Sequence, residues 1–278
     1  MIARSWLFCP ADRPDRLTRA VDVADVAVAD LEDAVATDAK ARARATVAEW
    51  LAADPARARR VWVRVNNEQD LVDADLDAIA GLGIAGVVLP KADLVTVTAL
   101  AGWLRVPVLP LVETAAALWR LPELAAVPGV ATVTLGEYDL AADLGVSGFE
   151  DDPQPLAWAR SGAVAAAAGC GLVPPPAPVT AAFDDREAFT ASTRALQRMG
   201  FAGRMCIHPR QVEWTHDAVR PGADDVERAR AVLAAAQDAE RKGSGVAVVS
   251  GRMVDAAVVR RARRVLALAA PDAGSVMD

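Results

Sequence analysis

The sequence has little of what builds the commonest metal and disulfide frameworks: three cysteines and two histidines occur among its 278 residues. Cys9, Cys170 and Cys206 are odd in number and widely spaced, and no CxxC pair occurs, so neither a disulfide framework nor a zinc knuckle is indicated. His208 and His216 have no cysteine partners, so nothing supports zinc. The GxGxxG fingerprint of a dinucleotide-binding sheet does not follow the first apolar run.

Long hydrophobic runs are also missing. No apolar stretch reaches the roughly 18 residues that a membrane-spanning helix needs. The first apolar run has four residues before Pro10, shorter than the roughly 7–15 of a signal peptide. We therefore expect a cytoplasmic protein that does not use a membrane. Thirty Lys and Arg against 37 Asp and Glu give a formal charge of −7, and this excess of acid argues against a nucleic-acid partner.

Hydrophobic residues, in contrast, make up 53% of the chain and charged residues 24%, which excludes disorder as its main state. Short apolar runs alternate with longer helical stretches, a pattern typical of βαβ units in a parallel sheet. Eight runs are found, at residues 6–9, 26–30, 61–65, 86–90, 106–112, 131–135, 171–173 and 205–208. Eight such units predict an α/β fold of the (β/α)8 TIM-barrel type, with a doubly wound sheet as the alternative.

Two helical stretches follow the eighth run. Residues 224–242 and 254–269 each carry apolar side chains at helical spacing along one face. A Gly-Ser-Gly break and a short strand-like run at 246–249 separate them. We therefore expect a barrel catalytic domain over residues 1–220 and a C-terminal helical extension over residues 221–278.

Polar residues gather where the predicted strands end, which is where barrel enzymes place their chemistry. They are Asp12, Arg13, Arg16, Asp30, Glu32, Asp33, Arg64, Asn66, Lys91, Glu113, Glu137, Asp139 and His208. So many polar groups at one mouth predict a charged, partly buried site.

Glu113 and Asp139 follow neighbouring predicted strands, so their carboxylates could share one hard cation. Mg²⁺ takes one or two protein carboxylates, keeps waters and accepts substrate oxygens. The alternative interpretation makes Glu113 and Glu137 first-turn acids that helix N-termini stabilise.

Arg64 lies within the apolar strand Val-Trp-Val-Arg-Val, and alternation places it on the same face as Trp62. A buried arginine must find an anion, because an unpaired buried charge is costly. Its partner is either a structural carboxylate such as Glu32 or Asp33, or a substrate carboxylate or enolate, which a planar guanidinium suits. Lys91 has the same ambiguity.

Two local basic clusters stand out in an acidic chain. They contain Arg13, Arg16, Lys40, Arg42 and Arg44. They are either solvated helix faces or a site for the phosphates of a nucleotide-like cofactor.

These residues lie in stretches that are recognisable together. The sequence resembles the citrate lyase β-subunit-like branch of the HpcH/HpaI aldolase and malyl-CoA lyase superfamily. The matching stretches follow the family order: SWLFCPADRPDR at 5–16, DLEDAV at 30–35, VRVN at 63–66, VLPK at 88–91, PLVETA at 110–115, GEYDLAADLG at 136–145, CIHPRQV at 206–212 and GRMVD at 251–255.

The resemblance implies a (β/α)8 barrel with a C-terminal lid that reaches a neighbouring subunit in a homotrimer or hexamer. It implies Mg²⁺ held by Glu113 and Asp139, and Arg64 bound to keto-acid or thioester oxygens. Glu32 and Asp33 would hold waters and orient Arg64.

The resemblance also assigns residues outside this centre. Asp255 matches the lid aspartate that acts from the adjacent subunit. The positions that would meet coenzyme A are Arg13, Arg16, Lys40, His208 and Pro209.

The resemblance implies an Mg²⁺-dependent carbon–carbon lyase. Its substrate would be a 3-hydroxyacyl-CoA such as citryl-, malyl- or citramalyl-CoA, cleaved to an acyl-CoA and a keto acid such as oxaloacetate. The alternatives are a metal-dependent aldolase on free keto acids, a malyl-CoA thioesterase or synthase, and a partner-dependent subunit of a citrate lyase complex. Two departures are VPPPAPV at 173–179, where relatives carry an acidic stretch, and Tyr138, where small or acidic residues are usual.

Overall fold

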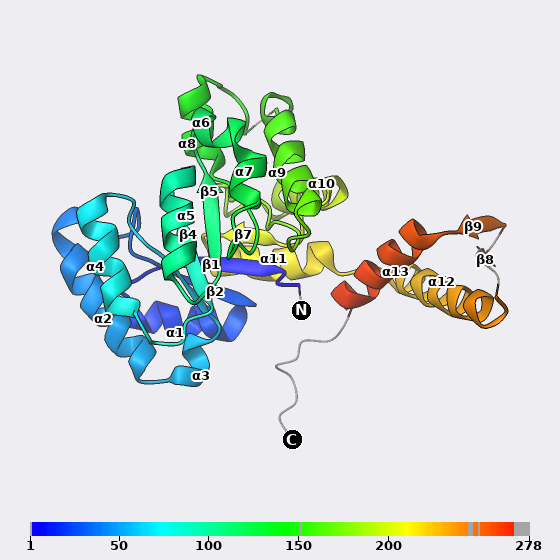
Figure 1. The fold of residues 1–278 in the computed structure, drawn as a ribbon, viewed down its shortest axis with the longest axis horizontal. Coiled ribbons are helices and arrows are strands. Elements are labelled where there is room, and N and C mark those ends of the chain that lie inside the picture. Colours follow the sequence, from blue (N-terminus) through cyan, green and yellow to red (C-terminus); the bar gives the residue numbers. More distant parts are fainter. Residues whose placement is uncertain (1, 151, 244–246, 250, 270–278) are drawn as a thin grey trace. The chain divides into compact units, whose positions relative to one another are not determined.

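The computed structural model describes residues 2–150, 152–243, 247–249 and 251–269. The chain divides into a larger unit, Ala3–Ala218, and a smaller unit that begins at Val219. Along the larger unit, strands alternate with helices (Figure 1). In chain order the elements are β1 (Ser5–Pro10), α1 (Pro14–Val23), β2 (Val26–Asp30), η1 (Thr37–Ala39), α2 (Lys40–Ala52), α3 (Pro55–Ala58), β3 (Val61–Arg64), α4 (Gln69–Ile79), β4 (Gly86–Leu89), α5 (Leu94–Trp103), β5 (Val108–Val112), α6 (Ala115–Trp119), α7 (Leu121–Ala125), β6 (Thr134–Leu135), α8 (Glu137–Leu144), η2 (Gln154–Leu156), α9 (Ala157–Gly169), α10 (Arg186–Met199), β7 (Arg204–Cys206) and α11 (Pro209–Val219).

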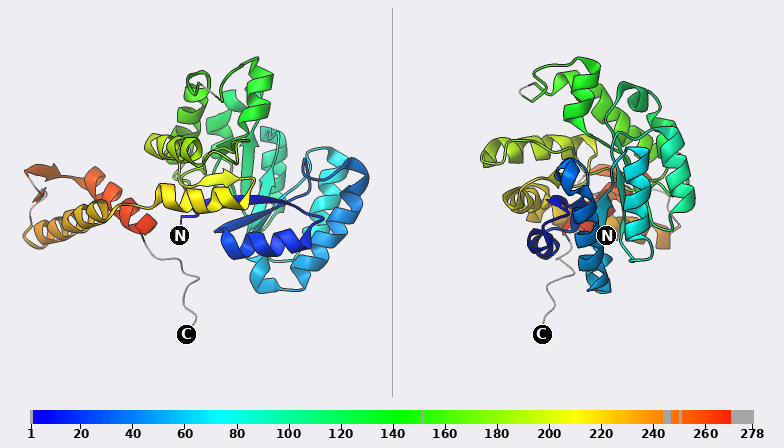
Figure 2. Two further views of the ribbon diagram at one scale, coloured as in Figure 1. Left: turned by 180° about the vertical axis from the view of Figure 1, so that it is seen from behind. Right: turned by 90° about the vertical axis from the view of Figure 1, so that its left-hand side faces the viewer.

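The strands of the larger unit form one curled, parallel, seven-stranded sheet in the order β6-β5-β4-β3-β2-β1-β7. The helices lie on its outer side (Figures 1 and 2). The predicted α/β fold built from βα units is therefore confirmed. Because all strands run the same way, their carboxyl ends meet at one edge of the sheet.

Side chains along each strand alternate between the helix-covered face and the inner face of the curled sheet. Val61, Val63 and Val65 belong to the large core shared with the helices. Trp62 belongs to a separate inner cluster, and its ring meets Trp6 edge-on at 5.1 Å. The alternation predicted for β3 is thus confirmed, and Arg64 shares the inner face with Trp62.

The strand predicted at residues 171–173 is wrong, because that stretch forms no strand. Prolines fill positions 174–176, and proline has no N–H to donate to a ladder. Pairing begins instead at Ala177, whose N–H donates to Gly203 O at 3.1 Å and whose carbonyl accepts from Met205 N at 2.8 Å. On the other side, Thr134 Oγ1 donates to Pro176 O at 2.7 Å. This segment therefore lies between β6 and β7.

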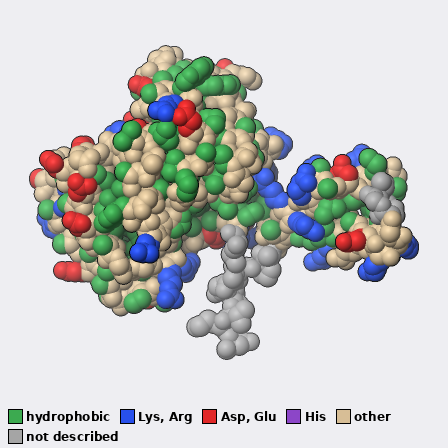
Figure 3. All heavy atoms as spheres, in the orientation of Figure 1, with side chains coloured by type: hydrophobic (Ala, Val, Ile, Leu, Met, Phe, Trp, Pro, Cys, Tyr) green, Lys and Arg blue, Asp and Glu red, His purple; other side chains and the backbone are tan. Residues whose placement is uncertain are grey.

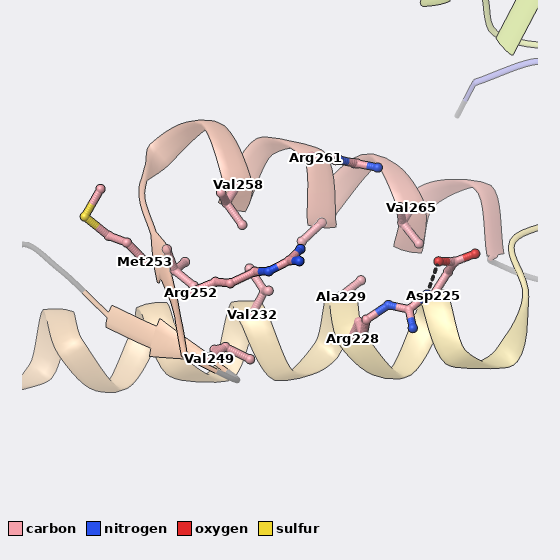
Figure 4. A pocket seen from close by; sticks show the side chains of 12 residues that line it. Asp225, Arg228, Ala229, Val232, Val249, Arg252, Met253, Val258, Arg261 and Val265 are labelled. Atoms are coloured by element: carbon pink, nitrogen blue, oxygen red, sulfur yellow. Dashed lines mark hydrogen bonds and ion pairs between the residues drawn. The ribbon is translucent and has the colours of Figure 1, made fainter. Parts of the chain in front are cut away.

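The smaller unit contains α12 (Ala223–Arg241), a β8–β9 antiparallel hairpin (Ala247–Val249 and Arg252–Val254) and α13 (Ala256–Ala269). The two helices pack along each other through apolar side chains such as Ala229 and Val258 (Figure 4). Both predicted helices are present, and the predicted strand at 246–249 is described over Ala247–Val249. None of the helices among the described residues is long and apolar enough to cross a membrane.

Candidate active site

A cavity of about 480 Å³ opens at the carboxyl ends of the strands. The residues that line it include Phe8, Arg16, Asp30, Asp33, Arg64, Glu113, Gly136, Asp139 and Val179. These residues come from the carboxyl ends of β1, β2, β3, β5 and β6, from the loops and first helical turns that follow those strands, and from the 173–179 segment. The parallel sheet thus brings together polar groups that are far apart in the sequence.

Arg64 is the most heavily paired side chain in this cavity. Its Nε and Nη2 contact both carboxylate oxygens of Asp30 at 2.7 and 2.5 Å. Its Nη1 lies 2.8 Å from Glu32 Oε2 and 3.5 Å from Asp33 Oδ2. Burial opposes the charge on Arg64, but the hydrogen bond to Asp30 and the surrounding carboxylates outweigh it and raise the pKa of the guanidinium. Arg64 is therefore a fixed positive charge with a fixed orientation.

Glu32 is also buried, and it connects Arg64 to a second cation. Its Oε1 lies 3.3 Å from Nζ of Lys91. Burial raises the pKa of the Glu32 carboxyl, although the positive charges of Arg64 and Lys91 oppose that rise. Its Oε2 is buried and is held by the ion pair with Arg64, without an aligned hydrogen bond.

Glu113 is a buried carboxyl at the end of β5 with one described hydrogen bond, from Lys91 N to Oε2 at 2.6 Å. Lys91, which donates this hydrogen bond, has a left-handed backbone with φ 44°. Burial raises the pKa of Glu113 to about 7, and the charges of Glu32 and Asp139 add to the rise. The Lys91 N–H and the charge of Arg64 oppose this rise without cancelling it.

Gly136 makes room for Glu113. A Cβ atom at position 136 would overlap the Oε1, Cγ and Cδ atoms of Glu113. The backbone of Gly136 has φ −94°, which any residue can adopt, so the glycine is required for space rather than for conformation.

Asp139 lies in the first turn of α8, where its exposed side chain lines the cavity with Glu113. Glu137, two residues earlier, is buried and accepts hydrogen bonds from Nε and Nη2 of Arg160 at 2.6 and 2.7 Å. All three acids line the cavity, but only Glu137 is held in a bidentate ion pair, with Arg160, among the described contacts. In the described residues no group of three or more His, Cys, Asp or Glu side chains could hold a metal.

The predicted coenzyme A residues are placed differently from one another. Arg16 lines the cavity. Arg13 is exposed and paired with Asp15 at 2.9 Å. Lys40 Nζ donates to the carbonyls of Leu31 and Glu32 at 2.7 and 2.6 Å, so it holds the loop that carries Glu32.

The other predicted residues lie outside the cavity lining. The His208 ring stacks on Phe183 at 5.4 Å, and its Nδ1 accepts from Arg210 N at 3.1 Å. Pro209 is the first residue of α11. Asp255 belongs to the smaller unit, where its Oδ1 accepts from Val258 N at 2.9 Å and begins α13.

Sequence reasoning missed three contributors to this site. Asp30 was expected only as a polar strand end, but it is the bidentate partner of Arg64. Its signal was its position two residues after inward-facing Val28. The Lys91 N–H and the space at Gly136 are backbone features, which no side-chain pattern predicts.

Fold and cavity together define an α/β enzyme whose polar groups sit at the carboxyl ends of parallel strands. The chain belongs to the HpcH/HpaI aldolase/citrate lyase family, whose profile matches residues 4–209. It is 34% identical to a citrate lyase subunit β-like protein of Deinococcus radiodurans, over 95% of this chain and 96% of that protein. It is 36% identical to a (3S)-malyl-CoA thioesterase of Cereibacter sphaeroides, over 96% and 94%.

A solved structure is similar over nearly the whole chain. The protein CitE of Mycobacterium tuberculosis, in complex with magnesium, acetoacetate and coenzyme A, superposes with a TM-score of 0.81 at 34% identity. The match covers 96% of this chain and 98% of that one.

Proposed function

We propose that this chain is an Mg²⁺-dependent carbon–carbon lyase that cleaves a 3-hydroxyacyl-CoA to a keto acid and an acyl-CoA. The observation that carries the proposal is that one cavity contains both the buried carboxyl of Glu113, whose pKa is raised, and the guanidinium of Arg64, which Asp30 holds in one orientation. Family membership and the similarity to CitE with magnesium, acetoacetate and coenzyme A support it.

Glu113 and Asp139 fit a hard cation. Both are oxygen donors, both line the cavity, and the raised pKa of Glu113 reflects a buried carboxyl whose desolvation the charge of Arg64 does not offset. Two protein carboxylates suit Mg²⁺, whose remaining ligands would be water and substrate oxygens. When bound, Mg²⁺ supplies positive charge to a developing alkoxide or keto oxygen.

Arg64 acts on the acyl half of the substrate. Cleavage between C2 and C3 leaves an acyl-CoA enolate, whose negative charge a guanidinium stabilises. Asp30 and Glu32 hold Arg64 in place, so no reorganisation is needed as that charge forms. Glu32 and Asp33 complete the group by orienting Arg64 and by accepting hydrogen bonds from water.

In this proposal Asp255 is the residue that transfers the proton. From a neighbouring subunit of a trimer or hexamer, its carboxyl protonates the enolate carbon, or removes that proton in the condensation direction. The C-terminal helices would then serve as a lid on a (β/α)8 barrel, with residues 1–220 as barrel and 221–278 as lid. Arg13, Arg16, Lys40, His208 and Pro209 would face coenzyme A, with Arg16 nearest the reacting groups.

The experiment is a product assay. Purified protein with Mg²⁺ is incubated with malyl-, citramalyl- and citryl-CoA, and the products are separated by chromatography. A keto acid and an acyl-CoA are expected, with activity lost in Glu113→Ala and Asp139→Ala. The proposal fails if no member of the panel is cleaved.

Thioester hydrolysis is the second candidate, because a (3S)-malyl-CoA thioesterase is 36% identical to this chain. The same assay separates the two reactions, since hydrolysis gives free malate and coenzyme A rather than glyoxylate and acetyl-CoA. Cleavage of free 3-hydroxy acids alone would select the aldolase alternative. Activity that appears only after adding citrate lyase partner subunits would select the partner-dependent one.

A further inference from the structure

A second cavity lies in the larger unit, next to the candidate active site. Its volume is about 690 Å³, and its walls include parts of α8, α9 and α10. The two cavities share Glu137, Tyr138 and Val179, and their other described lining residues differ. The buried side chain of Arg204 lines this second cavity, which we call the Arg204 cavity.

Arg204 is the first residue of β7, on the face of the sheet that the helices cover. Strand alternation places it on the same face as Cys206, which belongs to the large core, and opposite Met205, which belongs to the inner cluster. Its guanidinium lies over the ring of Phe189 in α10, with Cζ 4.4 Å from the ring centroid. Charged side chains are spread over the surface of the larger unit, where water solvates them (Figure 3). Arg204 is 3% exposed, so its charge depends on groups within the protein.

The described hydrogen-bond partners of Arg204 are all neutral. Its Nε donates to Pro178 O at 3.1 Å. Its Nη1 contacts three oxygens of α10, which are Phe189 O, Ser192 Oγ and Thr193 Oγ1, at 3.2, 2.7 and 2.6 Å. Both hydroxyls donate their own hydrogens to Phe189 O, so they meet Arg204 as acceptors. Among the described contacts, Nη2 forms no hydrogen bond and no carboxylate pairs with the guanidinium.

The described buried charges that line the Arg204 cavity do not balance. Arg160 and Glu137 form a bidentate ion pair, so these two charges cancel. Arg204 adds a positive charge beside them. Burial lowers the pKa of Arg204 to about 10, and the charge of Glu137 does not offset this effect, so Arg204 is still a cation at neutral pH. A buried cation of this kind is stabilised by an anion with one negative charge.

We propose that the Arg204 cavity binds a small monocarboxylate with an apolar body, whose carboxylate accepts a hydrogen bond from Nη2 of Arg204. A carboxylate fits better than a phosphate dianion, because the exposed carboxylates of Glu150 and Asp185 also line the cavity and would repel a second negative charge. This inference does not depend on the proposed function.

The remaining lining fits a hydrocarbon chain. Its apolar side chains include Phe149, Pro153, Ala157, Val179, Leu196 and Met199. Small-molecule sites have volumes of roughly 300–1,000 Å³ and are mostly apolar, with a few polar groups that orient the ligand. The Arg204 cavity has this composition, with the guanidinium as the group that fixes the charged end of the ligand.

The first test measures the binding of unbranched carboxylates, from butyrate to octanoate, by calorimetry. Affinity should rise roughly fourfold for each added CH₂ group, because each group leaves water for the apolar lining. Octan-1-ol should bind at least about tenfold more weakly than octanoate, since it has no charge to pair with Arg204. Equal binding of the alcohol, or no binding of any acid, would overturn the proposal, including the case in which a carboxylate of another protein chain fills the cavity.

The second test supplies a carboxylate from the protein itself and keeps Arg204 in place. Ser192 lines the cavity with its Oγ 2.7 Å from Nη1 of Arg204, so Ser192→Asp brings a negative charge to the guanidinium. Ser192→Asn is the matched control, because Asn has nearly the shape and the helix propensity of Asp without its charge.

We expect Ser192→Asp to melt at a higher temperature than Ser192→Asn in the absence of ligand. Ser192→Asp should also bind octanoate at least about tenfold more weakly than wild type does, whereas Ser192→Asn should bind it like wild type. Equal melting temperatures of the two variants would show that Arg204 needs no anion. Equal octanoate affinities would place the acid elsewhere, and either result would overturn the proposal.

Discussion

At the scale of single residues, Arg64 and Glu113 differ in how well the free protein stabilises their charged forms. Both are buried ionisable groups in one cavity. Arg64 is surrounded by carboxylates, so its charge is stabilised in the free protein. Burial and the charges of Glu32 and Asp139 raise the pKa of Glu113 to about 7 against the opposing effects of the Lys91 N–H and Arg64, so at neutral pH it is divided between its acid and its carboxylate forms. A bound cation would stabilise the carboxylate form of Glu113.

This difference predicts how Mg²⁺ binding depends on pH. Because the pKa of Glu113 is raised to about 7, a proton occupies the site below that pH and must leave when Mg²⁺ binds. The apparent Mg²⁺ affinity should fall about tenfold per pH unit below pH 7 and level off above it. Calorimetry at pH 6 in two buffers of different ionisation enthalpy should report release of about one proton. Affinity that does not change between pH 5 and 8 would contradict this assignment.

Gly136 gives a second prediction at this scale. In Gly136→Ala the new Cβ overlaps the carboxyl of Glu113, which must then move. We expect activity and Mg²⁺ affinity to fall at least about tenfold, the cost of a small misplacement of a catalytic group, with the circular dichroism spectrum retained. Gly102→Ala, where a Cβ meets no atom within 4 Å, is the control and should behave as wild type. Full activity in Gly136→Ala would show that Glu113 need not stay in place.

At the scale of elements, much of the larger unit follows from residue patterns. The period of two in Val-Trp-Val-Arg-Val correctly predicts which face of β3 carries Arg64, because burial on both faces fixes the register. The seventh predicted strand, at residues 171–173, does not form because three prolines displace the pairing to Ala177. Asp30 rather than Glu32 is the bidentate partner of Arg64 because the parallel register places Asp30 of β2 directly beside Arg64 of β3, and no pattern within either strand specifies that register.

Helices α2 and α4 are joined to the end of β3 through one buried carboxylate. Asp75 is fully buried and accepts from Arg44 Nε at 2.9 Å and from Asn66 N and Nδ2 at 2.8 and 2.7 Å. Arg44 therefore has a structural partner, which favours a structural role over the phosphate-binding interpretation of its cluster.

We expect Asp75→Ala to lower the free energy of unfolding by about 3–5 kcal/mol, because it leaves the charge of Arg44 and the amide of Asn66 without their partner. Urea denaturation at pH 7 measures this. Asp73→Ala removes an exposed carboxylate from the same helix and should change stability by less than about 0.5 kcal/mol. Equal effects of the two substitutions would refute the structural role of Asp75.

At the scale of the whole molecule, the proposed catalytic groups are divided between the two compact units. Arg64 and Glu113 belong to the larger unit and Asp255 to the smaller one. If Asp255 acts on a neighbouring subunit, two different inactive variants should repair each other. Asn at 255 retains the oxygen that begins α13, so Asp255→Asn should fold normally.

We therefore expect inactive Glu113→Ala and Asp255→Asn proteins to regain activity when they are unfolded together and refolded. Random assembly pairs an intact barrel with an intact aspartate in about a quarter of the sites of a cyclic oligomer. Each variant refolded alone is the control. Mixtures that stay inactive would place Asp255 on the active site of its own chain or outside the reaction.

Neighbouring strands of the larger unit are joined over unequal lengths. Strand β6 has two residues, and beside it the chain at Ala177 is joined to β7 by a single bridge and to β6 through Thr134. A sheet opens first where the fewest hydrogen bonds must break. Amide hydrogens there should exchange with deuterium long before those of β1 to β3. The wall of the cavity next to Gly136 and Asp139 would thus open more readily than the wall that holds Arg64. Ligands would enter and leave by local opening of the sheet between β6 and β7, while the guanidinium of Arg64 stays in position.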